Sequence, residues 1–162
     1  MNKILNINQG IKTAKKLRKE GKRIVLAGGI FDILHVGHIK FLEKAKKKGD
    51  VLFVLLESDE TARKLKGEKR PINNQRTRAL VLSALEAVNY TILLPRMKND
   101  KDYDRLITLI KPMVIAISEN DANIKHKKRQ AKIIGAKVVS VTAQISNQST
   151  TRLIKIIEEN TL

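Results

Sequence analysis

The sequence predicts a single α/β domain over residues 1–162, built as a Rossmann-like, doubly wound sheet of five parallel strands with helices on both faces. Three observations support this prediction. The length suits one domain, five runs of branched apolar residues recur along the chain, and amphipathic helical patterns separate these runs. Each run is nearly continuous in apolar residues rather than alternating, so both faces of each strand should be covered. Strands that alternate with helices in this way indicate a parallel sheet.

The expected elements follow from these patterns in chain order. The strands are residues 23–28, 51–57, 90–95, 113–118 and 137–142. The helices that follow them are residues 39–48, 74–88, 101–110, 123–134 and 150–159. A further helix over residues 7–20 ends at Gly21, so residues 1–21 are expected to form an N-terminal helix preceding the core. The longest irregular segment, residues 63–74, is polar and contains Gly67 and Pro71, and long loops in compact domains are often functional.

The composition is typical of a globular protein that attracts anions. The chain has 33 basic and 16 acidic residues, a net charge of +17 that favours nucleotides, sugar phosphates, nucleic acid or acidic membranes as ligands. No apolar run approaches the roughly 20 residues that cross a bilayer, and residues 1–23 lack the apolar core of a secretory signal. We therefore expect a cytoplasmic protein that does not use a membrane. Because the chain has no cysteine, it can form no disulfide or thiolate site.

The stretch GGIFDILHVGH, from Gly28 to His38, follows the first predicted strand and opens the next helix. In an open parallel sheet this turn is the usual phosphate site. Glycines such as Gly29 allow close backbone approach, and Gly37 and His38 should begin a helix whose free N–H groups favour phosphate. The imidazoles of His35 and His38 can donate hydrogen bonds to phosphate oxygens, and nearby anionic charge should raise their pKa values.

This stretch resembles the G-x-F-D-x-x-H-x-G-H signature of the cytidylyltransferase-like nucleotidyltransferases. The matching residues are Gly29, Phe31, Asp32, His35, Gly37 and His38. The resemblance implies transfer of AMP or CMP from ATP or CTP to a phosphorylated small molecule, a sugar phosphate or polyol phosphate, with release of pyrophosphate and usually with Mg²⁺. It also implies a homodimer, because relatives commonly form dimers.

Other segments extend the resemblance through most of the chain. Lys66-Gly67 matches a lysine-glycine pair after the second strand, and Ser149-Thr150-Thr151 matches the S-T-T that begins the last helix of the family. The bacterial heptose 1-phosphate adenylyltransferases share the most similar central segments, and the glycerol 3-phosphate cytidylyltransferases are the other similar group. The central segments are Arg70-Pro71-Ile72-Asn73, Arg76 and the ALEAV of residues 84–88.

Two positions support these matches on physical grounds. Arg76 and Arg78 should lie in the first turn of a helix, where cations oppose the macrodipole, so an anionic ligand would relieve the conflict. Ser149 is a good N-cap, and Arg152 takes the place of the glutamate of a capping box, which leaves the helix entrance positive.

The resemblance implies a role for each matched residue. His35 and His38 are expected at the α-phosphate, Lys66 at the α-phosphate or the incoming phosphate, and Ser149 to Thr151 at the β- and γ-phosphates. Asp32 could orient the site or help to hold the metal. The nucleotide-binding set is expected to be Gly29, Ile30, Phe31, Asp32, Gly37, Arg76, Ser149, Thr150 and Thr151.

Departures from the relatives leave the acceptor open and modestly favour ATP. The cytidylyltransferases carry R-Y-V-D-E-V with a nucleotide-binding arginine, where this chain has Glu86-Ala87-Val88-Asn89. The adenylyltransferases have aspartate at Asn89 and K-G-G-D-Y where residues 118–122 read SENDA, which weakens the case for a heptose. Ile30 replaces the usual cysteine or threonine.

Two other functions compete with nucleotidyl transfer. A basic nucleic-acid-binding module would explain the charge of +17, but aromatic residues make up only 3% of the chain and no RNA- or DNA-binding motif accompanies them. We therefore consider nucleic acid an unlikely partner. The HVGH segment also occurs in class I aminoacyl-tRNA synthetases, but this chain is too short and lacks a K-M-S-K-S-like partner motif.

Overall fold

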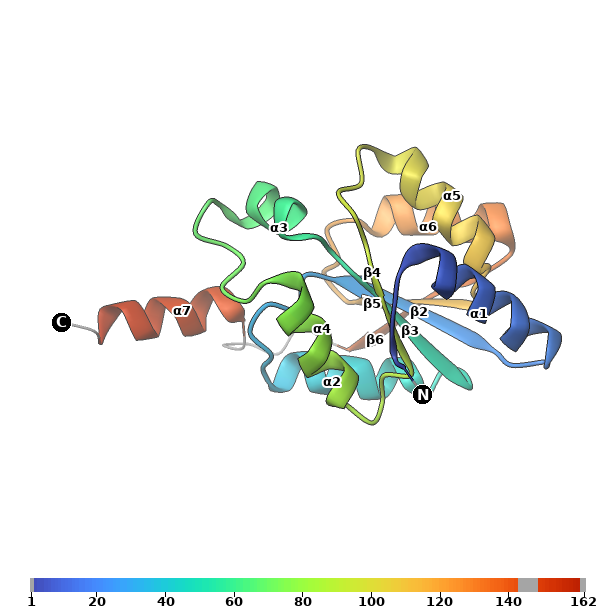
Figure 1. The fold of residues 1–162 in the computed structure, drawn as a ribbon, viewed down its shortest axis with the longest axis horizontal. Helices are drawn as coiled ribbons and strands as arrows, with labels where there is room; N and C mark the ends of the chain where they lie inside the picture. The colour runs from blue at the N-terminus through green and yellow to red at the C-terminus, as the bar shows by residue number, and fades with distance from the viewer. Residues whose placement is uncertain (1, 143–148, 161–162) are drawn as a thin grey trace.

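A computed structural model describes residues 2–142 and 149–160 (Figure 1). Within these residues, six parallel strands form one sheet in the order β1-β4-β3-β2-β5-β6. The strands are β1 (Ile4–Leu5), β2 (Ile24–Gly29), β3 (Val51–Leu56), β4 (Tyr90–Leu93), β5 (Val114–Ser118) and β6 (Lys137–Thr142). The chain steps outward from β2 to β3 and β4 and then returns to the other side of β2 for β5 and β6, so the doubly wound fold is confirmed.

The prediction of five strands was wrong by one strand at the edge. In β1, Ile4 pairs with Thr91 and Leu5 with Ile92, and the Thr91 N–H donates a hydrogen bond of 2.8 Å to the Lys3 carbonyl. Two residues are too few to show a periodic pattern, so this strand left no signal in the sequence. The N-terminal segment therefore supplies the sheet edge as well as the expected helix.

Helices cover both faces of the sheet (Figure 1). The elements are α1 (Ile7–Lys19), α2 (Val36–Lys46), α3 (Asp59–Lys66), α4 (Gln75–Ala84), α5 (Asp100–Ile110), α6 (Ile124–Ile134) and α7 (Thr150–Glu159). One face packs against α1, α5 and α6, and the other against α2 and α4. None of the helices in the described ranges has the length and apolar character needed to cross a membrane.

The two faces of the sheet bury separate hydrophobic clusters, as the continuous apolar runs predicted. Alternate residues of β2 supply the two sides, with Leu26 in the cluster beneath α1, α5 and α6 and Val25 in the cluster beneath α2 and α4. Phe53 and Val54 of β3 divide in the same way, and both are fully buried. This packing fixes the strands, and hence holds the loops at their carboxyl ends in place.

The expected loop over residues 63–74 is shorter than predicted, because its first residues belong to α3. The Ser58 hydroxyl accepts a hydrogen bond of 3.1 Å from the Thr61 N–H, and Asp59 and Glu60 lie in the first turn, where negative charge favours a helix. The helix ends before Gly67, which has a positive φ of 99° that glycine adopts without strain. Residues 67–74 form the remaining loop.

Candidate active site

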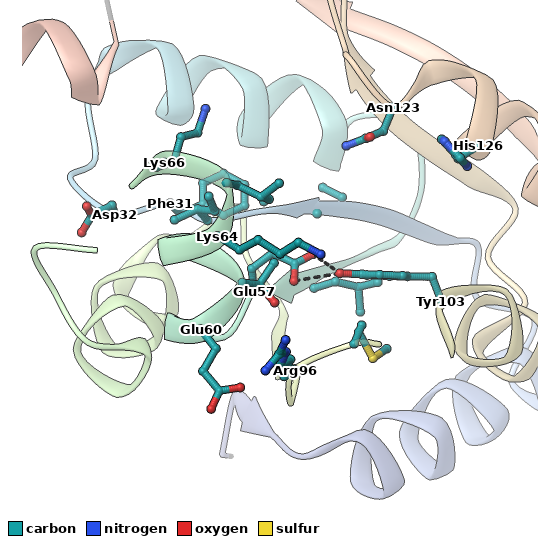
Figure 2. A pocket seen from close by; sticks show the side chains of 18 of the residues that line it. Phe31, Asp32, Glu57, Glu60, Lys64, Lys66, Arg96, Tyr103, Asn123 and His126 are labelled. Carbon is teal, nitrogen blue, oxygen red and sulfur yellow. Dashed lines mark hydrogen bonds between the residues drawn. The ribbon is translucent and has the colours of Figure 1, made fainter. Parts of the chain in front are cut away.

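A cleft of about 1360 Å³ opens at the carboxyl ends of β2 and β3, beside β5. The sheet order places the topological switch point, where the strand order reverses, between β2 and β5, which is where open α/β sheets bind ligands. Residues from α3, α5, α6 and the start of α7 complete its walls. Figure 2 shows Phe31, Asp32 and Lys66 at one end of this cleft and Tyr103, Asn123 and His126 at the other.

The turn after β2 is tightly packed around Phe31. This residue adopts a positive φ of 47°, which is uncommon for a residue other than glycine, and its side chain is buried. A Cβ added to Gly29 would lie 2.9 Å from the Phe31 ring, so only glycine fits there. The Phe31 ring meets His38 edge-on with the ring centroids 5.2 Å apart. The strained turn therefore fixes the position of this histidine.

His35 and His38 form a stacked pair at the start of α2, with ring centroids 3.8 Å apart and planes 27° apart. His35 is the N-cap of this helix, and its Nδ1 accepts a hydrogen bond of 3.2 Å from the Gly37 N–H. The expectation that the Gly37 N–H is free for phosphate is therefore wrong, because the histidine itself uses it. Since Nδ1 is the acceptor, Nε2 carries the proton of the neutral His35 ring and is the donor available to a ligand.

Burial keeps both imidazoles neutral near pH 7. It lowers the pKa of His35, and together with the neighbouring His35 it lowers the pKa of His38 to about 4. The Nδ1 atom of His38 is buried and has no hydrogen-bond partner among the described residues. A neutral imidazole still donates one N–H bond. That a bound phosphate raises these pKa values stays a prediction.

Asp32 holds the loop of residues 67–74 against the histidine turn. One carboxylate oxygen accepts hydrogen bonds from Arg70 Nε at 2.7 Å and the Ile72 N–H at 2.9 Å, and the other accepts from the Asn73 N–H at 2.9 Å. Burial alone would raise the pKa of Asp32, but these bonds outweigh it and lower the pKa. Of the two roles expected for Asp32, the geometry favours orienting the site, because the loop already occupies both oxygens.

The two arginines of the first turn of α4 have different environments. Arg78 is buried, and its guanidinium donates to the Glu57 carbonyl at 2.9 Å, to Asp59 at 2.8 Å and to the Ile30 carbonyl. The proposed conflict with the macrodipole is therefore relieved at Arg78 by protein acceptors rather than by a ligand. Arg76 is exposed and does not line the cleft, so the structure does not bring it to the other predicted site residues.

The distant S-T-T segment does reach the histidine turn. Ser149 caps α7 as predicted, because its hydroxyl accepts a hydrogen bond of 3.1 Å from the Arg152 N–H. The Thr150 hydroxyl donates a bond of 3.0 Å to the Ile33 carbonyl. Ser149, Thr150 and Thr151 line the same cleft as His35 and His38, as does Lys66 at the end of α3. The histidine turn, the end of α3 and the S-T-T segment are distant in sequence but line one cleft.

The pair formed by Glu57 and Tyr103 was not predicted from the sequence. The Tyr103 hydroxyl lies 3.0 Å from each Glu57 carboxylate oxygen and donates to them (Figure 2). Burial raises the pKa of Glu57, while Tyr103 and the charges of Arg78 and Lys127 oppose this rise. A signal existed in the sequence, because Glu57 is a charged residue at the carboxyl end of an otherwise apolar strand.

Comparison with known proteins settles the family. Residues 26–156 match the family model described as cytidylyltransferase-like. The chain belongs to the cytidylyltransferase-like family. This confirms the resemblance drawn from the histidine motif.

Similar proteins agree with this assignment. The bifunctional protein HldE of Aliarcobacter butzleri is 43% identical over 162 residues, which cover 96% of this chain and 32% of that protein. HldE of Wolinella succinogenes is 49% identical over 113 residues, 70% of this chain and 23% of that protein. The chain thus spans about a third or less of the length of these relatives.

Solved structures share the fold. A lipopolysaccharide core biosynthesis protein from Thermoplasma volcanium superposes with a TM-score of 0.61 at 31% identity, covering 80% of this chain and 100% of that one. A pantoate-beta-alanine ligase from Francisella tularensis superposes with a TM-score of 0.68 over 96% of this chain and 76% of that one, and at 20% identity it shows the fold alone.

Proposed function

We propose that this chain transfers a nucleotidyl group from a nucleoside triphosphate, ATP in preference to CTP, to a phosphorylated sugar or polyol. The observation that carries this proposal is the stacked pair of His35 and His38 at the start of α2. The bond from Thr150 to the Ile33 carbonyl holds the S-T-T segment beside this pair. Imidazole donors, a helix N-terminus and hydroxyls on one wall of a cleft suit a triphosphate.

The reaction needs positioning and charge stabilisation more than a protein nucleophile. An oxygen of the acceptor phosphate forms a new bond to the α-phosphorus, the bond from that phosphorus to the bridging oxygen of the β-phosphate breaks, and pyrophosphate leaves. His35 and His38 would donate to the α-phosphate, Lys66 would neutralise the α-phosphate or the incoming phosphate, and Ser149 to Thr151 would hold the leaving phosphates. Each donor aimed at the developing charge is typically worth about 3 to 4 kcal/mol.

Mg²⁺ would enter as part of the nucleotide substrate. No group of three or more His, Asp or Glu side chains within the described ranges is arranged to hold a metal ion, and Asp32 is occupied by the loop. A resident metal site therefore does not fit these residues. Magnesium often binds through substrate phosphates with few protein ligands, which is consistent with this arrangement.

The choice of substrates rests on residues that differ between the two similar groups and on the relatives. The missing arginine of the cytidylyltransferases and the similarity to the heptose 1-phosphate adenylyltransferases favour ATP. The Thermoplasma volcanium relative, a lipopolysaccharide core biosynthesis protein, favours a sugar phosphate. The argument from Asn89 against a heptose does not hold, because its side chain accepts a bond of 2.8 Å from the Leu52 N–H at the amino end of β3, away from the cleft.

Pyrophosphate release tests this proposal directly. The purified chain would be incubated with Mg²⁺ and ATP or CTP, and with sugar phosphates, glycerol 3-phosphate, choline phosphate or FMN as acceptors. We expect release with ATP and a sugar or polyol phosphate, its loss in His38→Ala, and its retention in the control Lys44→Ala, which changes an exposed residue of α2 outside the cleft. No release from any pair would refute the proposal. The homodimer and the cytoplasmic location stay predictions, and light scattering checks the first.

A further inference from the structure

The Glu57 carboxylate lies where the cleft meets the histidine turn. All six residues of β3, Val51–Leu56, are buried and apolar, and Glu57 follows them at the carboxyl end. The Glu57 N–H donates a bond of 3.1 Å to the Gly29 carbonyl, which places this residue directly beside the glycine of the histidine motif. Its carboxylate lines the cleft and is held by Tyr103 of α5 (Figure 2).

The surroundings of this carboxylate give it unused capacity to bind. The same cleft is lined by Leu55, Met97, Ile107 and Ile115, and partial burial among apolar side chains disfavours a charged group unless donors satisfy it. The Tyr103 hydroxyl brings one proton, whereas an ionised carboxylate offers about four lone-pair sites. Glu57 can therefore accept further hydrogen bonds from a molecule in the cleft.

The position of Glu57 in the sheet points to the acceptor rather than to the nucleotide. The crevice at the topological switch point lies between β2 and β5, whereas Glu57 follows β3 on the opposite side of β2. A carboxylate repels phosphate groups, so it faces uncharged donors of a ligand. The hydroxyl groups of a sugar or polyol acceptor are donors of this kind.

The charges around the cleft select among uncharged and cationic acceptors. Arg96, Lys98 and Lys127 line the same cleft, where seven basic side chains face five acidic ones, and the whole chain carries a net charge of +17. This positive field attracts the acceptor phosphate and disfavours an acceptor whose body carries a quaternary ammonium group. Hydroxyl groups satisfy Glu57 without adding positive charge.

We propose that Glu57, oriented by Tyr103, is the specificity-determining residue that binds hydroxyl groups of the acceptor and so selects polyol phosphates. This inference rests on the proposed nucleotidyl transfer. Glu57 would contact substrate, and Tyr103 would act through Glu57 as a positioning residue.

The test measures the KM values for ATP and for the acceptor separately. The wild-type chain would be assayed for pyrophosphate release with ATP and the best of glycerol 3-phosphate, glucose 1-phosphate, mannose 1-phosphate and ribose 5-phosphate, and with choline phosphate. Glu57→Gln removes the charge and one acceptor atom at nearly constant shape. We expect it to raise the acceptor KM roughly 10-fold or more, as for a lost bond to a charged group, with the ATP KM unchanged. Thermal unfolding verifies the fold of each variant.

The matched control is Glu43→Gln. Glu43 is an exposed glutamate of α2 that does not line the cleft, so the same substitution there should leave both KM values unchanged. A rise in the ATP KM of Glu57→Gln would mean that Glu57 contacts the ribose, and it would overturn the inference. Unchanged KM values, or wild-type turnover of choline phosphate as fast as of the polyol phosphates, would also overturn it. Absence of turnover with every pair would overturn the proposed function as well, so the two failures are distinguishable.

Tyr103→Phe supplies a second readout that a purely structural role would not move. The Tyr103 bond lowers the pKa of Glu57, as do the charges of Arg78 and Lys127, against the rise caused by burial. Its loss should raise this pKa, so that the acid limb of kcat/KM for the acceptor moves to higher pH than in the wild type. The acceptor phosphate titrates equally in both assays, so it does not contribute to the difference between the two pH profiles. An unmoved limb would contradict the positioning role of Tyr103.

Discussion

His38 should make the folded chain sensitive to mild acid. Burial and the neighbouring His35 lower its pKa from 6.5 to about 4, so the native state takes up this proton at lower pH than the unfolded chain does. Above pH 6.5 both states hold a neutral imidazole and the full stability is present. As the pH falls from 6.5 towards 4, the unfolded chain binds the proton first, and stability is lost over that window.

The size of the loss follows from the two pKa values. A separation from 6.5 to about 4 corresponds to roughly 3 kcal/mol over the whole window, and to about 2 kcal/mol between pH 7 and pH 5. Domains of this kind unfold at a free energy of about 5 to 15 kcal/mol, so the change is a measurable share of the total.

Guanidinium chloride unfolding at pH 7, 6 and 5 measures this loss. His38→Gln removes the titrating group, so its free energy of unfolding should fall about 2 kcal/mol less than that of the wild type between pH 7 and pH 5. His126→Gln is the matched control, because it changes a half-exposed histidine and keeps His38. Equal losses in the wild type and in His38→Gln would refute the burial argument.

Three further predictions concern the contacts around the site. Arg78→Met should destabilise the fold by about 3 to 5 kcal/mol, because it removes a buried guanidinium that donates to the Ile30 and Glu57 carbonyls and to the partly exposed Asp59 carboxylate, whereas Arg76→Met should stay within about 0.5 kcal/mol; equal denaturant midpoints would contradict this contrast. Asp32→Asn should cost about 1 to 3 kcal/mol and speed tryptic cleavage in residues 67–74, because it loses acceptors for that loop; an unchanged cleavage rate would count against the loop-holding role. Thr150→Val should raise the KM for ATP about 10-fold with little change in melting temperature, because it loses the bond to the Ile33 carbonyl that positions the S-T-T segment; an unchanged KM would separate this segment from nucleotide binding.

The fold could be predicted wherever a single element carries its own pattern. Residues 51–56 are six consecutive buried apolar residues, and this run alone identifies a two-sided strand. By contrast, β1 has two residues and exists because Ile4 and Leu5 reach the free edge of β4, a contact that no local pattern encodes. The start of α3 was encoded by Ser58 and the acidic residues after it, but no helix was predicted there, because Gly67 and Pro71 gave the whole polar segment 63–74 the pattern of a loop.

The site was predictable to the extent that its residues are neighbours in sequence. The histidine turn lies within eleven residues, Gly28 to His38, so its motif and its place after a strand could be seen together. Roles set by distant partners could not be seen. Asp32 depends on Arg70 and Arg78 on Asp59, and both pairings arise only when α3, α4 and the loop between them close over the turn.

This chain departs from its relatives at several positions, and distance from the cleft separates those that affect specificity from those that do not. Asn89 differs from the adenylyltransferases, yet its side chain bonds to the amino end of β3 and does not line the cleft. The changed segment of residues 118–122 leads into α6 beside the cleft, where Asp121 pairs with Lys127 at 2.7 Å. Lys127 in turn lowers the pKa of Glu57. Altered acceptor choice should therefore come from this coupled group of charges, whereas restoring aspartate at position 89 should leave the acceptor unchanged.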